Sequence, residues 1–203
     1  MTDAPQIYLL TPPEIGPGFP DRLARLMDAA EVGCLRLAAA SRDEDLVVRA
    51  ADALLPVAHE REVALLIDDH AALVPRLGLD GVHLTDGSRS VADIRRALGG
   101  DVVIGAHCGA SRHDGMSAGE RGADYVAFGP VGETALGHGE RAPRDLFEWW
   151  FEMIEVPVVA EGVVDAQAVE RLAPFVDWIA LGEEIWRHDD PSAALRTITA
   201  PLR

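Results

Sequence analysis

Short apolar runs alternate with longer amphipathic segments along the whole chain. The apolar runs are rich in Val, Ile, Leu and Ala, which is typical of strands that are buried on both faces of a parallel sheet. They predict eight strands, near residues 7–10, 34–37, 63–67, 81–84, 102–106, 125–128, 158–160 and 178–181. Apolar residues with helical spacing predict eight helices, near residues 20–30, 44–58, 71–77, 91–98, 116–121, 144–154, 166–172 and 191–199.

The regular succession of strand and helix sets the fold class. Repeated βα units build a parallel sheet, and eight units with tight connections favour a closed barrel over an open, doubly wound sheet. No linker, low-complexity tract or shift in composition divides the sequence. We therefore expect one α/β domain over residues 1–203, folded as a (β/α)8 or TIM barrel.

Composition and charge exclude several classes of function. The formal net charge is −16, which excludes nucleic acid as a partner because phosphate backbones are bound by clustered Lys and Arg. An anionic membrane surface is excluded for the same reason. The basic side chains are all arginine, so chemistry that needs a lysine, such as Schiff-base formation, is also excluded.

The cysteines and the N-terminal residues bear on the compartment. Cys34 and Cys108 have no metal-binding or redox spacing, so we expect buried, reduced thiols. The first residues lack the basic region of a secretory signal, and no apolar run has the length of a membrane span. The sequence therefore predicts a cytoplasmic protein.

Polar residues cluster where the predicted strands end. Ligands of a parallel barrel bind at the carboxyl ends of its strands, so these residues are the candidates for chemistry. They are Thr11, Arg36, Asp68, Asp69, residues 83–88, His107, Cys108, residues 129–134, Glu161, Gly162 and residues 182–184.

Arg36 and His107 are the two candidates with the clearest chemistry. Arg36 alternates with two leucines and should face the barrel interior, where an unpaired charge is costly. It needs an anionic partner, either a carboxylate such as Asp69 or a ligand phosphate. His107 ends a strand and could act as a general acid or base, because its ordinary pKa is near neutrality. A structural, hydrogen-bonded histidine is the alternative, and for His83, inside a strand, we expect a place in a core layer.

Three aspartates suggest a magnesium site. Asp68 and Asp69 follow one strand and Asp86 follows the next, and carboxylate oxygens are the ligands that Mg²⁺ prefers. The alternative is that Asp68 or Asp69 caps the helix that follows.

Four stretches of the chain together resemble a known family. They are residues 65–70 (LLIDDH), 77–84 (LGLDGVHL), 104–108 (IGAHC) and 122–130 (GADYVAFGP). In this order they are similar to the thiamine phosphate synthase family and to its thiazole tautomerase branch, TenI. The resemblance covers most of the chain.

The resemblance implies a TIM barrel that joins a pyrimidine pyrophosphate to a thiazole phosphate with Mg²⁺. The expected partners are thus small-molecule substrates, and a homodimer is expected. Site residues are implied only where this sequence keeps the pattern or offers a substitute. They are Arg36 and His107 for catalysis, Asp69 for the metal with Asp86 near the place of the second metal ligand, and Thr134, Gly129, Gly162, Glu161, Gly182 and Glu183 for substrate.

Several positions depart from the family pattern. The phosphate-binding lysine falls at Gly137, and Glu161 and Glu183 stand beside the implied phosphate pocket. Like charges a few ångströms apart repel, so the departures predict weak phosphate binding unless arginines or protons compensate these glutamates. Two alternatives follow: a divergent, TenI-like enzyme on a less anionic or cationic substrate, and a ligand-binding or regulatory barrel without catalysis.

Overall fold

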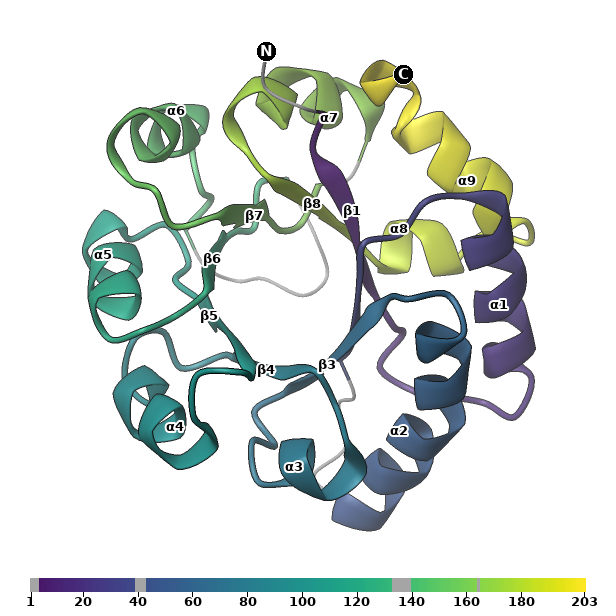
Figure 1. Cartoon of the computed structure of the whole chain (residues 1–203). Helices are drawn as coiled ribbons and strands as arrows, with labels where there is room; N and C mark the ends of the chain where they lie inside the picture. Colours follow the sequence, from purple (N-terminus) through teal and green to yellow (C-terminus); the bar gives the residue numbers. More distant parts are fainter. Residues whose placement is uncertain (1–3, 39–42, 133–139, 164) are drawn as a thin grey trace.

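A closed barrel of eight parallel strands forms the centre of the structure (Figure 1). The computed structural model describes residues 4–38, 43–132, 140–163 and 165–203. The strands pair in chain order, and β8 closes the barrel against β1. Their bounds are β1 Gln6–Leu10, β2 Cys34–Leu37, β3 Ala64–Asp68, β4 Gly81–Leu84, β5 Val103–His107, β6 Tyr125–Phe128, β7 Val158–Ala160 and β8 Trp178–Leu181. The predicted TIM barrel is confirmed.

Helices surround the barrel on the outside (Figure 1). Their bounds are α1 Phe19–Ala29, α2 Glu44–His59, α3 Leu73–Leu77, α4 Val91–Leu98, α5 Arg112–Glu120, α6 Arg144–Met153, α7 Ala166–Leu172, α8 Glu183–Trp186 and α9 Pro191–Ile198, with 3-10 turns at Ala173–Phe175 and Ala200–Leu202. The short α8 was not predicted, and α5 begins four residues earlier than expected. Within the described ranges, no helix combines the length and the apolar character that crossing a bilayer would require.

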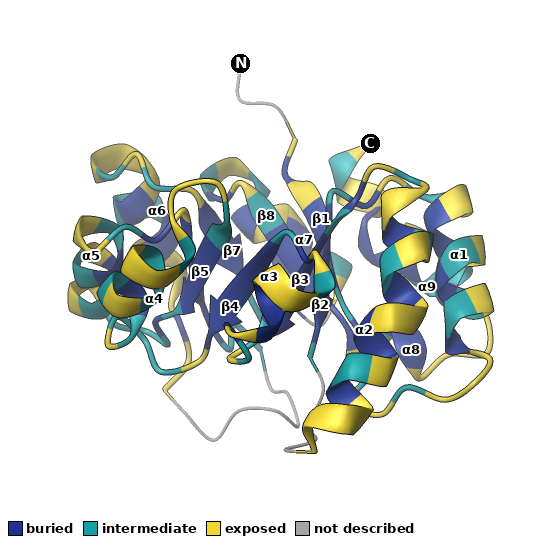
Figure 2. Cartoon of the chain, turned by 60° about the horizontal axis from the view of Figure 1, so that its bottom comes forward, coloured by how far each residue is buried: buried dark blue, intermediate teal, exposed yellow. Residues whose placement is uncertain are grey.

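The core has two layers, one on each side of the barrel wall. Outside the wall, apolar side chains of the strands pack against the inner faces of the helices, while the outer helix faces are exposed (Figure 2). Inside the wall, a smaller cluster fills the lumen. It consists of Tyr8, Cys34, Leu66, Tyr125, Ala127, Val159 and Ala180. Cys34 and Cys108 are buried free thiols, as expected.

The alternation of side chains along each strand predicts which residues point into the lumen at the carboxyl end of the barrel. Side chains two residues apart on a strand point to the same face, so the position two residues after a lumen residue also points inward. Arg36 therefore follows Cys34, and Asp68 follows Leu66. By the same rule Glu161, just beyond β7, follows Val159. Charged groups from three strands thus converge above an apolar floor.

Candidate functional site

A pocket of about 710 Å³ opens at the carboxyl end of the barrel, where TIM barrels bind their ligands. It brings together six of the site residues that the family resemblance implies, along with Thr11, Asp68 and His83 from the candidates at the strand ends, and Arg187 of the segment after α8 also faces it. The predicted residues in its lining are Arg36, His107, Glu161, Gly162, Gly182 and Glu183.

Arg36 lies at the centre of the charged groups. Its guanidinium pairs with two carboxylates: Nε is 3.1 Å from Oδ1 of Asp68, and Nη1 donates to Oε1 of Glu161. These side chains are largely buried, with exposed fractions of 8% for Arg36, 20% for Asp68 and 14% for Glu161. Arg36 has carboxylate partners, as one of the two expectations had it, but the aspartate is Asp68 and not the suggested Asp69, because β3 directs Asp68 inward and leaves Asp69 exposed.

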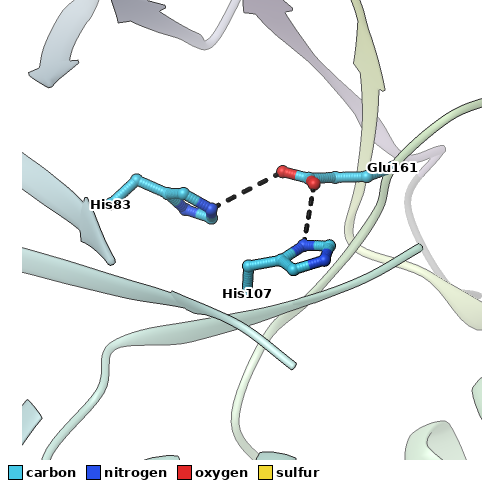
Figure 3. A group of neighbouring side chains, drawn as sticks. All are labelled: His83, His107 and Glu161. Atoms are coloured by element: carbon cyan, nitrogen blue, oxygen red, sulfur yellow. Dashed lines mark ion pairs between the residues drawn. The ribbon is translucent and has the colours of Figure 1, made fainter. Parts of the chain in front are cut away.

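His107 and Glu161 form an ion pair (Figure 3), and Arg36 contacts the same carboxylate. Nδ1 of His107 is 2.9 Å from Oε2 of Glu161. Burial disfavours the charged imidazole, but the neighbouring carboxylate outweighs it and raises the pKa of His107. Burial likewise opposes the ionised form of Glu161, yet Arg36 and His107 hold the pKa of that carboxyl well below its usual range. The pair therefore favours the protonated form of an imidazole that is 31% exposed.

His83 lies beneath this pair and is fully buried. Its Nδ1 is 2.8 Å from the hydroxyl of Tyr125, which is 2.6 Å from the hydroxyl of Tyr8. Its Nε2 has no hydrogen-bond partner and lies 3.7 Å from Oε1 of Glu161. Burial and the nearby Arg36 lower the pKa of His83 well below its usual value. His83 is therefore a neutral imidazole in the lumen, as expected, but it also lines the pocket floor.

Asp68 should make the stability of the protein depend on pH. Burial raises its pKa to about 6 against the pull of Arg36, whereas an unfolded aspartate has a pKa of about 3.9. The folded state holds this proton more tightly, so the free energy of unfolding falls as the pH rises between these two values. Asparagine does not titrate, so the free energy of unfolding of Asp68→Asn, measured relative to that of the unsubstituted protein, should rise by roughly 3 kcal/mol between about pH 4 and about pH 7.

Urea unfolding of both proteins across this pH range measures the gain. Asp101→Asn is the matched control, because Asp101 is exposed and distant from the pocket lining. The same pH trend in both variants would mean that the stability change does not come from the burial of Asp68.

The predicted metal ligands lie on the loops after β3 and β4. Both carboxylate oxygens of Asp69 accept hydrogen bonds from Thr85, at 2.8 Å from its N–H and 2.5 Å from its hydroxyl. Asp86 accepts from Ser90 through Oδ2, while its Oδ1 is buried without a hydrogen-bond partner. The N-terminus of α3 has no side-chain cap, so the alternative that Asp68 or Asp69 caps this helix is wrong. The unpartnered oxygen of Asp86 fits a hard cation such as Mg²⁺.

The implied substrate-binding glycines have distinct surroundings. A Cβ on Gly129 would lie 2.7 Å from the carbonyl oxygen of Glu161, so only glycine lets the ends of β6 and β7 approach this closely. Gly162 has a φ of 73°, which also favours glycine. The N–H of Gly182 already donates to the carboxylate of Glu184, at 2.6 Å. Thr134 lies outside the described residues.

Known proteins resemble this chain over nearly its whole length. The family model described as thiamine monophosphate synthase matches residues 7–185. The thiamine-phosphate synthase of Rhodospirillum centenum is 36% identical, with all of both chains covered. The chain belongs to the thiamine monophosphate synthase family. A second thiamine-phosphate synthase, from Erythrobacter litoralis, is 36% identical over 93% of this chain and 91% of that protein.

Solved structures agree with this assignment at the level of the fold. The thiamine phosphate pyrophosphorylase of Pyrococcus furiosus superposes with a TM-score of 0.81 at 19% identity, covering 97% of this chain and 95% of that chain. A geranylgeranylglyceryl phosphate synthase from Thermoplasma acidophilum superposes with a TM-score of 0.73 at 16% identity, covering 99% and 94%. The family resemblance recognised in the sequence is confirmed.

Sequence reasoning missed several groups that this member of the thiamine monophosphate synthase family brings to the pocket. The inward direction of Asp68 could have been found from its spacing to Leu66. Arg187 follows the unpredicted helix α8 and gave no signal in the sequence. The contact of His83 with the pocket needed the three-dimensional pairing of β4 and β5.

Proposed function

We propose that this protein joins a pyrimidine pyrophosphate to a thiazole phosphate, giving thiamine phosphate, in the pocket at the carboxyl end of its barrel. The observation that carries the proposal is the 36% identity to the thiamine-phosphate synthase of Rhodospirillum centenum along all of both chains. A pocket of about 710 Å³ is also in the usual size range of a small-molecule site.

The charges of the pocket support an anionic substrate in spite of the missing lysine. Glu161 and Glu183 were both expected to repel phosphate; Arg36 and His107 pair with Glu161 and compensate its charge, whereas Glu183 stays a carboxylate of the pocket lining. Arg187 lines the same pocket and adds a cationic side chain at the rim. Electrostatic stabilisation by such groups is a large part of catalysis when a charged group leaves. In this proposal Arg36 and His107 orient the substrates, and Arg187 contacts a phosphate group.

Asp69 and Asp86 would hold Mg²⁺ in this reaction. When bound, Mg²⁺ would balance the charge that develops on the leaving pyrophosphate. The hydrogen bonds from Thr85 orient Asp69 and tie the loop after β3 to the loop that carries Asp86.

The His107–Glu161 pair favours a second candidate, a proton transfer of the thiazole tautomerase type. A carboxylate 2.9 Å from an imidazole orients the ring and stabilises its protonated form, as general acid–base catalysis requires. The partly exposed ring can then exchange a proton with a ligand in the pocket.

The proposal predicts that the purified protein forms thiamine phosphate from pyrimidine pyrophosphate, thiazole phosphate and Mg²⁺. Mass spectrometry detects the product. Arg187→Gln should raise the KM for the pyrophosphate about 10-fold, since a hydrogen bond to a charged group contributes about 1.5 kcal/mol or more. Arg171→Gln in α7 is the control, because Arg171 does not line the pocket.

No product from folded protein would contradict synthase activity, and a KM that Arg187→Gln leaves unchanged would contradict the phosphate contact of Arg187. Deuterium exchange into a thiazole precursor, without product, would instead support the tautomerase candidate. His107→Gln should abolish that exchange, while a non-catalytic barrel would show neither reaction. The cytoplasmic location and the homodimer stay predictions.

A further inference from the structure

Two histidines and a glutamate lie close together in the pocket. The proposed reaction gives these three residues no role as a group. His83 from β4, His107 from β5 and Glu161 after β7 point toward one another (Figure 3). One ligand atom from each lies within 4.8 Å of the others, and within the described part of the chain this is the one such group of three. Each side chain lines the pocket.

The unpartnered nitrogens point to a ligand that is not a protein group. His83 is fully buried, yet its Nε2 has no hydrogen-bond partner. Nδ1 of His107 also lacks a hydrogen bond of normal geometry, although it is only 2.9 Å from Glu161. Buried polar atoms nearly always have partners. Two unpartnered nitrogens aimed at one carboxylate are the arrangement that a bound cation would satisfy.

The distances suit a transition metal ion after small side-chain adjustments. Two ligand atoms bound at about 2.1 Å to a tetrahedral ion lie about 3.4 Å apart. Here the nitrogen of His107 lies 2.9 Å from Oε2 of Glu161, the nitrogen of His83 lies 3.7 Å from Oε1 of the same carboxylate, and one ligand atom from each residue lies within 4.8 Å of the others. Tyr125 contacts the other ring nitrogen of His83, and such outer contacts fix the tautomer of metal-binding histidines.

The charges around the cluster also favour a cation. Arg36 is shared between two carboxylates, Asp68 and Glu161, so when both are ionised and His107 is neutral, the form that binds a metal, the group carries one net negative charge. Arg36 occupies Oε1 of Glu161, which leaves Oε2, the oxygen beside His107, for a metal. Imidazole nitrogens suit Zn²⁺ and related ions, whereas Mg²⁺ prefers oxygen ligands. The cluster is therefore chemically distinct from the predicted magnesium ligands Asp69 and Asp86.

We infer that His83, His107 and Glu161 form a binding site for a divalent transition metal ion of the Zn²⁺ type, with its open coordination position toward the pocket. Three protein ligands and one open position are the pattern of a zinc ion that also contacts a substrate. The site shares His107 with the proposed synthase reaction, but its test is independent of that reaction, because metal binding can be measured without any substrate.

The test uses the untagged, full-length chain after treatment with a chelator. Titration with Co²⁺, followed by its visible absorption, and with Zn²⁺, followed by calorimetry, should give one equivalent per chain. His107→Gln should weaken Zn²⁺ binding on the order of 100-fold or more, and Tyr125→Phe on the order of 10-fold. A large excess of Mg²⁺ should not displace the bound ion.

His113→Gln is the matched control, because His113 is exposed on α5. Circular dichroism confirms that each variant is folded. The inference is overturned if the folded, unsubstituted chain binds no Co²⁺ or Zn²⁺, or if His107→Gln binds as tightly as His113→Gln. Thiamine phosphate formation without metal binding would contradict this site alone, and metal binding without product would contradict the synthase activity alone.

Discussion

Replacing Glu161 by glutamine should lower the free energy of unfolding by about 3 kcal/mol. Breaking a buried ion pair from one side leaves the other charge without compensation, which costs about 3–5 kcal/mol. We expect the lower end of this range, because Arg36 still pairs with Asp68 after Glu161 is replaced. The same substitution removes the carboxylate that raises the pKa of His107, so that pKa should fall. Urea unfolding measures the first effect, and an NMR titration of the imidazole measures the second.

Glu170→Gln makes the same chemical change on the exposed face of α7. Exposed substitutions usually alter stability by less than about 0.5 kcal/mol. A loss of stability as small as this in Glu161→Gln would mean that Asp68 alone satisfies the guanidinium of Arg36. An unchanged pKa of His107 would contradict the ion pair itself.

Gly105→Ala should be the most destabilising of the small substitutions in the lumen. A Cβ at this position would lie 1.9 Å from Cζ and 2.2 Å from the hydroxyl oxygen of Tyr125. The ring has little room to move, since its hydroxyl contacts both Tyr8 and His83. Overpacking of this kind costs about 3 kcal/mol or more, and thermal unfolding should show the loss.

Gly100→Ala is the matched control, because a Cβ there meets no atom within 4 Å. The double variant Gly105→Ala with Tyr125→Leu should recover part of the lost stability, since leucine lacks the atoms that clash. If the two substitutions are simply additive, the contact between residue 105 and the Tyr125 ring is not the cause.

Local pattern was enough to predict the barrel, because each strand is a short apolar run between polar turns. The exceptions have physical causes. The first turn of α5 is polar and contains Gly115, so its sequence has no apolar stripe; Ser111 starts it through a side-chain bond to the N–H of Asp114. The helix α8 has four residues, which is too short for a helical period to be recognised.

The site was harder to predict because its contacts join distant strands. Alternation along β2 placed Arg36 in the lumen, but its partners come from β3 and from the end of β7. His83 looked like a core residue because the residues around it in β4 are buried. Gly105 lies between His83 and Tyr125 in the strand register, and its missing side chain lets them meet. No single strand carries that information.

The polar contacts across the lumen also bear on how the chain unfolds. Arg36 with Glu161, and Tyr125 with both Tyr8 and His83, pair side chains of the first four strands with side chains of the last four. A half-barrel cut between β4 and β5 would expose buried groups that have lost their partners. The two halves should therefore melt together in one cooperative transition, and neither should fold when expressed alone.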